Sequence, residues 1–202
     1  MKTGVIIAAA GKSIRFGTDK RESLLYGKPL IIRTVQSFLP LQCPILVVTN
    51  GELGPDVYNQ LGSMTKLLVL PPEKSSDPKS GLGDSLSAGI QYATNQKWDA
   101  VLIALGDMPL IKSSTMQMLF DGLMDNPATV PVYRGQWGHP VGFHNQYFEK
   151  LALLRGDKGA RRILRDAGPK EIAVDDPGIL YDIDTPEQLV LAHESGIGMF
   201  SN

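Results

Sequence analysis

Short runs of apolar residues alternate along the chain with segments in which apolar residues recur at helical spacing. The run at 5–10 precedes a helical pattern from Pro29 to Leu39, and the run at 45–49 precedes a shorter one at 57–61. Continuous apolar runs of this length are typical of strands buried on both faces of a parallel sheet. The pattern therefore predicts an α/β fold whose helices cover both faces of the sheet.

The rest of the chain continues this alternation, with one departure from it. The further predicted elements are strands at 66–70, 99–105 and 172–174 and helices at 113–124 and 148–154. Two apolar runs, 128–133 and 139–144, are separated only by a turn at 134–138, so we expect them to form an antiparallel pair. We therefore expect residues 1–202 to form one domain, a three-layer sandwich with a mostly parallel sheet and a small antiparallel insertion.

Capping residues predict where several helices begin. Asp84 or Ser85 is expected to cap the helix that follows a loop at 71–83, and Ser114 with Gln117 has the spacing of a capping box. Thr185, Pro186 and Gln188 form a strong helix start near the carboxyl end, and another helix is expected to begin near Lys158. The loop at 71–83 is either a lid over a site or a surface excursion.

Composition excludes several classes of protein. Hydrophobic residues make up 43% of the 202 residues and charged residues 20%, and a net charge of −1 provides no overall field for nucleic acid or an anionic membrane. The single cysteine, Cys43, is expected to be a buried apolar residue and fits a reducing cytoplasm. No apolar run reaches the roughly 20 residues that span a bilayer. We expect a cytoplasmic protein without nucleic-acid or membrane partners.

The loop after the first apolar run has the composition of a polyphosphate site. It contains Gly11 and Gly17, which let backbone N–H groups approach a phosphate, and the cations Arg15 and Lys20. The spacing of a P-loop would need glycine in place of Ile6, and the dinucleotide fingerprint is also incomplete. The residues therefore favour a triphosphate loop of another kind.

Two acidic positions suggest a cation site beside this loop. Asp107 follows the apolar run at 99–105, where a strand tip would meet the loop, and Mg²⁺ needs only one or two protein carboxylates. Asp182 and Asp184 precede the last helix on one extended segment, and either is a candidate for a second contact. Three histidines and one cysteine without the spacing of zinc ligands do not predict a zinc site.

Several motifs in order resemble the MobA-like nucleotidyltransferases, and the chain is most similar to the molybdenum cofactor cytidylyltransferases among them. They are AAAGKSIRFG with Lys20, GLGDSLSAG from Gly81, LGDMP around Asp107, GHPVGF from Gly138, GDKGAR from Gly156 and DIDTPEQL from Asp182. Phe16 and the Arg21-Glu22-Ser23 segment depart from the usual pattern. The resemblance implies a Rossmann-like, nucleotide-diphospho-sugar transferase-like fold.

The resemblance also implies roles for individual residues. The nucleotide would be bound by Ala9, Ala10, Gly11, Ser13, Arg15, Lys20, Gly83, Ser85 and Asp107. Arg15, Lys20 and Asp107 would carry the catalysis, and Asp107 with Asp184 would hold Mg²⁺. The acceptor would be bound by His139, Pro140, Asp157 and Arg161. From the residues alone, Asp157 and Arg161 have an alternative, since they could also pair with each other.

The implied reaction is Mg²⁺-dependent transfer of a nucleoside monophosphate, CMP from CTP, to the phosphate of molybdopterin, with release of pyrophosphate. The implied partners are a nucleoside triphosphate, a phosphate-bearing acceptor and a molybdoenzyme that receives the product. Two alternatives remain open at this point. One is a cytidylyl or uridylyl transferase that acts on an isoprenoid or sugar phosphate, and the other is a non-catalytic nucleotide-binding protein that delivers a cofactor.

Overall fold

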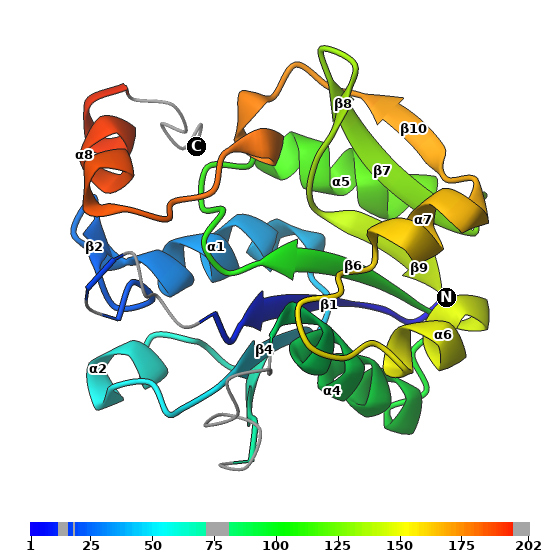
Figure 1. Cartoon of the computed structure of the whole chain (residues 1–202), viewed down its shortest axis with the longest axis horizontal. Helices are drawn as coiled ribbons and strands as arrows, with labels where there is room; N and C mark the ends of the chain where they lie inside the picture. The colour runs from blue at the N-terminus through cyan, green and yellow to red at the C-terminus, as the bar shows by residue number, and fades with distance from the viewer. Residues whose placement is uncertain (12–15, 18, 72–80, 196–202) are drawn as a thin grey trace.

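The computed structural model describes residues 1–11, 16–17, 19–71 and 81–195 (Figure 1). Ser13 and Arg15, which were predicted to bind the nucleotide, and residues 72–80 of the predicted loop lie outside the described residues. Among the helices that are described, none is both long enough and apolar enough to cross a membrane.

The main sheet is mostly parallel, as predicted. Its strands are β1 (Thr3–Ala9), β4 (Ile45–Thr49), β5 (Thr65–Val69), β6 (Ala100–Leu105), β7 (Ala128–Tyr133), β8 (Gln136–Trp137), β9 (Val141–His144) and β10 (Lys170–Ala173). The order is β10-β7-β9-β6-β1-β4-β5, with β8 paired to β7. Strand β1 lies between β4 and β6 and is parallel to both, whereas β9 is antiparallel to β6 and β7. The predicted antiparallel insertion is therefore confirmed.

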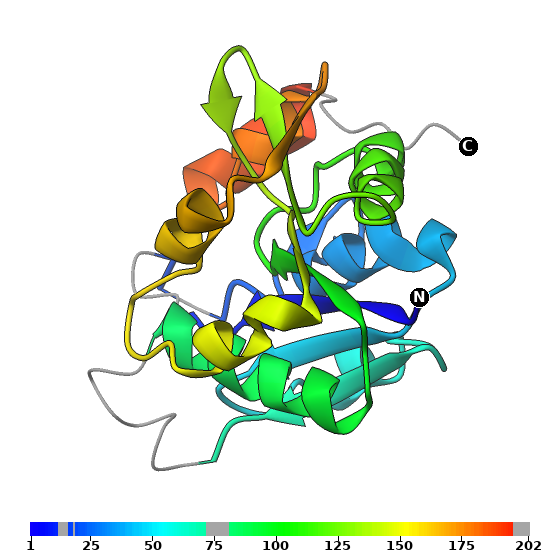
Figure 2. The ribbon, with the colours of Figure 1, turned by 90° about the vertical axis from the view of Figure 1, so that its right-hand side faces the viewer.

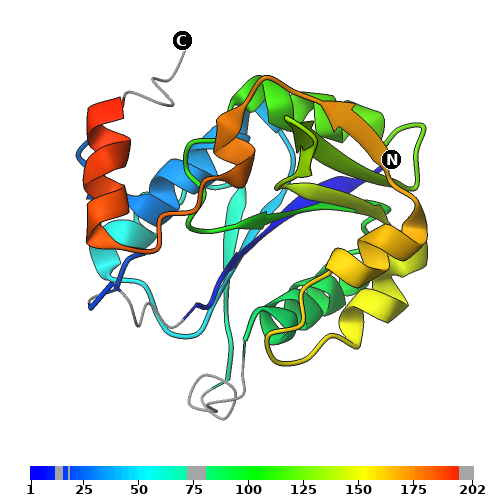
Figure 3. The same ribbon diagram turned by 45° about the horizontal axis from the view of Figure 1, so that its top comes forward.

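Helices cover both faces of this sheet. They are α1 (Leu30–Phe38), α2 (Pro55–Tyr58), α4 (Leu82–Asn95), α5 (Ser113–Gly122), α6 (Phe148–Ala152), α7 (Arg161–Ala167) and α8 (Pro186–Ser195), with 3₁₀ turns η1 (Leu39–Leu41), η2 (Asn145–Tyr147) and η3 (Pro177–Leu180). Helices α1 and α5 lie on one side of β1 and α4 on the other (Figures 1 and 3). The predicted three-layer, Rossmann-like architecture is confirmed.

The sheet core explains why the first apolar run carries no alternation. Val5 and Ile7 pack in the cluster that contains α1 and α5, while Ile6 and Ala8 pack in the cluster that contains α4. Both faces of β1 are buried, so every position must be apolar or small. Cys43 is buried in the first cluster, as expected.

A third, smaller cluster attaches the last helix to the segment after β1. A hairpin of β2 (Leu24–Leu25) and β3 (Lys28–Pro29) lies beside α8 (Figure 1). Leu25 and Leu30 pack there with Ile183 and Ala192 of the carboxyl-terminal segment. This packing brings the end of the described chain to the loop that follows β1.

Two predicted helix caps were wrong and one was confirmed. Helix α4 is capped at Gly81, because the carboxylate of Asp84 reaches back to the Gly81 N–H at 3.2 Å. Helix α5 starts at Ser113 without a side-chain cap, and Gln117 donates to Asp121 instead of forming a box with Ser114.

At α8, by contrast, Thr185 and Gln188 form the predicted reciprocal capping pair. The Gln188 side-chain oxygen accepts from the Thr185 N–H at 3.0 Å, and the Thr185 hydroxyl accepts from the Gln188 N–H at 3.3 Å. This cap fixes the direction in which the chain enters the last helix.

The region from 134 to 161 also differs in detail from the prediction. Gln136 and Trp137, expected in a turn, pair with β7 as β8, and this hairpin projects at the top of Figure 2. Strand β9 begins at Val141 rather than His139, because the His139 N–H donates to the carbonyl of Ile179 and Pro140 has no N–H. Helix α7 begins at Arg161 rather than near Lys158.

Candidate functional site

The carboxyl ends of β1 and β6 place two sequence motifs side by side. The two strands are parallel, with Ala8 opposite Leu105, so Ala10 and Gly11 leave the sheet beside Gly106 and Asp107. A β-carbon at Gly106 would lie 2.8 Å from the β-carbon of Ala9, so only glycine permits this approach. The glycine brings the Asp107 carboxylate to the start of the loop after β1.

Three charged side chains from distant parts of the sequence meet at this edge. Lys20 Nζ lies 2.7 Å from Asp107 Oδ2 and 2.7 Å from Asp184 Oδ1. The Lys20 side chain is 12% exposed and the two carboxylates about 20%, so water screens the group only partly. The other carboxylate oxygen of Asp107 is buried and has no hydrogen-bond partner among the described residues. The structure therefore brings together three of the residues predicted for catalysis and metal binding.

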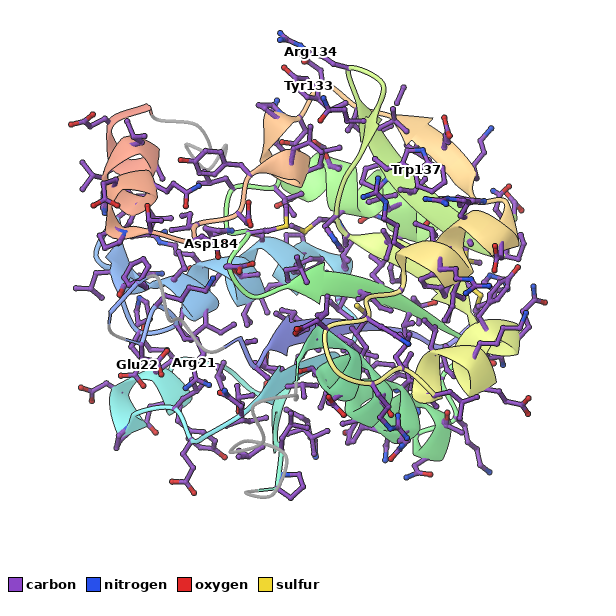
Figure 4. All side chains as sticks on the ribbon, viewed as in Figure 1. Arg21, Glu22, Tyr133, Arg134, Trp137 and Asp184 are labelled. Atoms are coloured by element: carbon purple, nitrogen blue, oxygen red, sulfur yellow. The ribbon has the colours of Figure 1, made fainter. Side chains whose placement is uncertain are left out.

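The segment before α8 is fixed so that Asp184 faces the strand tips. The Ile183 N–H donates to the Asp107 carbonyl at 2.9 Å, and the Asp184 N–H donates to the Gln188 side chain at 2.7 Å. Asp184 is labelled between α1 and α8 in Figure 4. Asp182, the alternative second metal contact, is exposed. The cap of α8 thus serves as a support for the Asp184 carboxylate.

The charges in this group favour the protonated form of Lys20. Burial alone would lower the pKa of Lys20, but the charges and hydrogen bonds of Asp107 and Asp184 outweigh it and raise the pKa above its usual value. The lysine is therefore an ammonium ion at neutral pH.

A small depression of about 30 Å³ opens at the same edge. It is lined by Ala8, Ala9, Gly11, Lys20, Arg21, Leu30, Gly106 and Asp107. Of the predicted nucleotide-binding residues, Ala9, Gly11, Lys20 and Asp107 thus share one surface, and Ala10 lies between two of them in the chain.

The other predicted nucleotide contacts lie at the start of α4. The Ser85 side chain is fully buried, and its hydroxyl makes a long contact of 3.5 Å with the Gly81 carbonyl. The Gly83 N–H donates to the Gly156 carbonyl at 2.7 Å. These residues are engaged with the protein itself and do not line the depression at Lys20.

Asp84 joins the start of α4 to the loop before α7. Its carboxylate accepts from the Gly81 N–H and from the Gly156 N–H, the latter at 2.9 Å. Asp157 also lies against Gly81. Sequence reasoning treated Asp84 only as a cap; its partner 72 positions away has no signal in local spacing.

A largely apolar cavity of about 220 Å³ lies between α4, β6, β9 and α7. It is lined by Leu82, Leu86, Ile103, Leu105, Trp137, Gly138, His139, Val141, Gly159, Ala160, Arg161 and Leu164. Two of the predicted acceptor residues, His139 and Arg161, therefore share one cavity. Pro140 follows His139 in a cis peptide bond and is buried. Among the described residues no ion pair joins Asp157 to Arg161.

The surroundings of His139 favour the neutral form of its imidazole. Burial lowers its pKa from the usual value, although a hydrogen bond with the backbone of Ile103 and the charges of Asp107 and Asp182 act in the opposite direction. Its Nδ1 atom is buried and has no hydrogen-bond partner within the described part of the chain. A neutral imidazole with one unpaired nitrogen can accept a hydrogen bond from a ligand.

Three known proteins are similar to this chain over nearly its whole length. The purine catabolism protein PucB of Bacillus subtilis is 29% identical over 91% of this chain and 92% of its own. The molybdenum cofactor cytidylyltransferase of Escherichia coli is 21% identical over 94% of each chain. Among solved structures, Rv0371c of Mycobacterium tuberculosis H37Rv has a TM-score of 0.82 at 23% identity, covering 96% of this chain and 98% of that one.

A second structure of Rv0371c, in complex with manganese, has a TM-score of 0.73 at 21% identity over the same shares of both chains. The family model of the MobA-like NTP transferase domain matches residues 5–172, which include both strand tips and the cavity. The resemblance inferred from the motifs is confirmed, and the chain belongs to the MobA-like NTP transferase family of nucleotidyltransferases.

Proposed function

We propose that this nucleotidyltransferase uses Mg²⁺ to transfer CMP from CTP to the phosphate of molybdopterin and releases pyrophosphate. The observation that carries the proposal is the meeting of Lys20, Asp107 and Asp184 at the carboxyl ends of β1 and β6. Similarity to the cytidylyltransferase of E. coli supports the choice of CTP and acceptor. The product would pass to a molybdoenzyme in the cytoplasm.

The carboxylates fit a hard divalent cation. Oxygens of Asp107 and Asp184 both lie 2.7 Å from the same ammonium nitrogen, so they already converge on one positive charge, and Asp107 has a second, unpaired oxygen. The described residues contain no cluster of three or more His, Cys, Asp or Glu side chains that would hold a metal alone. Mg²⁺ commonly takes one or two carboxylates and completes its shell with water and phosphate, and there it would neutralise phosphate charge.

Lys20 would then serve the triphosphate. With a metal held by the two carboxylates, the ammonium group would be available to the phosphates. The other predicted phosphate contacts are Arg15 and the backbone N–H groups of Ala10, Gly11 and Ser13. The nucleotide would extend from this edge toward Gly83 and Ser85 at the start of α4. Fixed positive charge that meets a developing negative charge is the main source of rate enhancement in such a site.

The chemical step needs no general base. An oxygen of the acceptor phosphate forms a bond to the α-phosphorus as the bond from this phosphorus to the oxygen that bridges to the β-phosphorus breaks. The acceptor phosphate is already anionic at neutral pH, so no proton has to be removed. Positioning of the acceptor by His139, Pro140, Asp157 and Arg161 and of the triphosphate by Lys20 would supply most of the catalysis.

The direct test is pyrophosphate release from CTP, GTP, ATP and UTP with molybdopterin as acceptor. Asp107→Asn should lower the rate by roughly 10²–10³-fold, the usual cost of removing one charge-stabilising group. Asp99→Asn is the matched control, since Asp99 lies at the opposite end of β6 and its carboxylate accepts from the Lys2 N–H. Full metal-dependent turnover in Asp107→Asn would contradict the site. Nucleotide binding without release of pyrophosphate from CTP when molybdopterin is present would contradict the reaction.

A further inference from the structure

We propose that Trp137, held in place by Glu171, is the surface on which a planar ring of the acceptor packs, and that it selects ring-bearing acceptors over polyol phosphates. This inference rests on the proposed function, which places the acceptor at His139 and Arg161. It adds Trp137 and Glu171 to the acceptor site, and it states that the acceptor contains a planar ring.

The walls of the cavity suit an apolar body. Apart from Trp137, His139 and Arg161, its lining side chains are aliphatic, and they include Leu82 and Leu86 of α4 and Leu164 of α7. An apolar cavity of about 150 Å³ is known to accommodate benzene. The cavity of about 220 Å³ is therefore large enough for a ring system bigger than benzene.

Among the described residues, the cavity has two polar side chains, and they offer different interactions to a ligand. His139 Nδ1 is unpaired within the described residues and can accept one hydrogen bond, while Arg161 provides one positive charge. A polyol phosphate would bring several hydroxyl groups, and each hydroxyl that is buried without a partner weakens binding. A heterocycle with one N–H toward His139 and an anionic arm toward Arg161 leaves fewer polar groups unpaired.

A hydrogen bond from β8 to β10, across β7, fixes the Trp137 side chain. Its indole N–H donates to Glu171 Oε1 at 2.8 Å. Trp137 pairs with Val132 of β7, and Glu171 pairs with Val130 two positions earlier on the same strand, so the two side chains lie on one face of the sheet on either side of β7. With its N–H occupied, the indole presents apolar surface to the cavity, and a ring held in one orientation loses little entropy when a ligand packs on it.

The neighbouring aromatic residue of the hairpin does not share this position. Tyr133 stacks with the guanidinium of Arg134 at 5.0 Å from its ring centre, at the tip of the β7–β8 hairpin and away from Trp137 (Figure 4). Neither residue lines the cavity. Trp137 is therefore the aromatic residue of the hairpin that an acceptor in this cavity would touch.

The test is calorimetric titration of the CTP-bound protein with two probes. Pterin-6-carboxylate is a planar two-ring anion, and erythritol 4-phosphate is a polyol phosphate. Pterin-6-carboxylate should bind the wild type, and Trp137→Ala should weaken binding about tenfold or more. Trp137→Phe keeps a ring but loses the N–H that Glu171 accepts, so it should weaken binding less than Trp137→Ala. Glu171→Ala should weaken binding, and Glu171→Gln should restore it, because the amide oxygen still accepts from the indole.

The affinity for CTP, measured in every variant, shows whether the fold and the nucleotide site are intact. Unchanged pterin-6-carboxylate binding in Trp137→Ala, or binding of erythritol 4-phosphate as tight as that of the pterin, would overturn the inference. Pyrophosphate release separates the two proposals. If the pterin binds through Trp137 but CTP releases no pyrophosphate when molybdopterin is the acceptor, the ring site stands and the proposed reaction fails. Turnover with erythritol 4-phosphate as acceptor would contradict the ring site and leave a transferase.

Discussion

Lys20 Nζ and Asp107 Oδ2 are 2.7 Å apart, although the two residues are separated by 87 positions in the chain. Asp184 contacts the same ammonium group at 2.7 Å. The lysine therefore holds together two carboxylates that would otherwise repel each other. A divalent cation would use the same oxygens, so the lysine and the metal compete for them.

Lys20→Met should raise the affinity for Mn²⁺ in the absence of nucleotide. Two unit charges 4 Å apart interact by about 4 kcal/mol at an effective dielectric constant of 20, and partial exposure reduces this, so we expect about a tenfold tighter Kd. The affinity for CTP should fall, because the triphosphate loses a cation. Titration followed by electron paramagnetic resonance measures free Mn²⁺ directly.

The matched control for this variant is Lys28→Met. The ammonium group of Lys28 donates to Gln36 and is not part of the carboxylate pair. Mn²⁺ binding that is unchanged or weaker in Lys20→Met than in Lys28→Met would show that the lysine and the metal do not share these oxygens.

The stability of the protein should depend on His139 in mildly acidic solution. Burial lowers the pKa of His139 in the folded state, whereas the unfolded chain takes up a proton near pH 6.5. The unfolded state thus binds more protons between these two values, so stability is fully present above about pH 6.5 and is lost as the pH falls toward the lower folded pKa. His139→Gln should remove this loss, as measured by urea denaturation between pH 7.5 and 5.

His193→Gln provides the comparison, because His193 is an exposed histidine on α8. It should keep the acid-dependent loss of the wild type. Identical pH dependence in His139→Gln and wild type would mean that the imidazole is not held neutral by its cavity.

Gly83→Ala should destabilise the contact between α4 and the loop before α7. A β-carbon at Gly83 would lie 2.7 Å from the Lys158 carbonyl oxygen and 2.8 Å from the Arg155 nitrogen, and backbone cannot move aside as a flexible side chain can. Overpacking costs about 1–3 kcal/mol. At this chain length each kcal/mol lowers Tm by roughly 2–4 °C. Gly51→Ala is the control, because among the described residues its new β-carbon would approach only Arg21, at 4.0 Å. The Tm of both variants is measured by thermal unfolding, and equal Tm values would refute the close contact.

Cys43 should be unreactive in the native protein. Burial raises the pKa of its thiol to about 11, so very little thiolate exists at pH 8. Labelling with a disulfide reagent should be slow in buffer and fast in urea. Because the chain has a single cysteine, the signal has one source. Fast labelling without denaturant would mean that the thiol is not in the core.

The fold and the main charged group follow from local features of the sequence. Strands such as 45–49 and 100–105 are continuous apolar runs, and the cap formed by Thr185 and Gln188 is contained within four residues. Asp107 could be placed at a strand tip because it follows the end of an apolar run, with only Gly106 between them. Its nearness to the loop that carries Lys20 follows from the rule that parallel strands end at one edge of the sheet. The approach of Asp184 depends on the segment before α8, where the Ile183 N–H donates to the Asp107 carbonyl.

Features that depend on distant partners were missed. Asp84 looked like a helix cap, but its carboxylate also receives the Gly156 N–H. Trp137 looked like part of a turn, and its bond to Glu171 depends on the pairing of β8 and β10 with the same strand. The cavity between α4 and α7 has no signal along the chain, since its walls come from segments separated by up to about 80 positions.

The most direct measurement of the central claim is a thermal-shift series with CTP, GTP, ATP and UTP, with and without Mg²⁺, on wild type, Asp107→Asn and Asp99→Asn. A ligand at 100 times its Kd adds about 2.7 kcal/mol of stability, which is easily detected. The account predicts a Mg²⁺-dependent rise in Tm with CTP that persists in Asp99→Asn and is lost in Asp107→Asn. A rise of equal size in Asp107→Asn, or none with any triphosphate in the wild type, would contradict it.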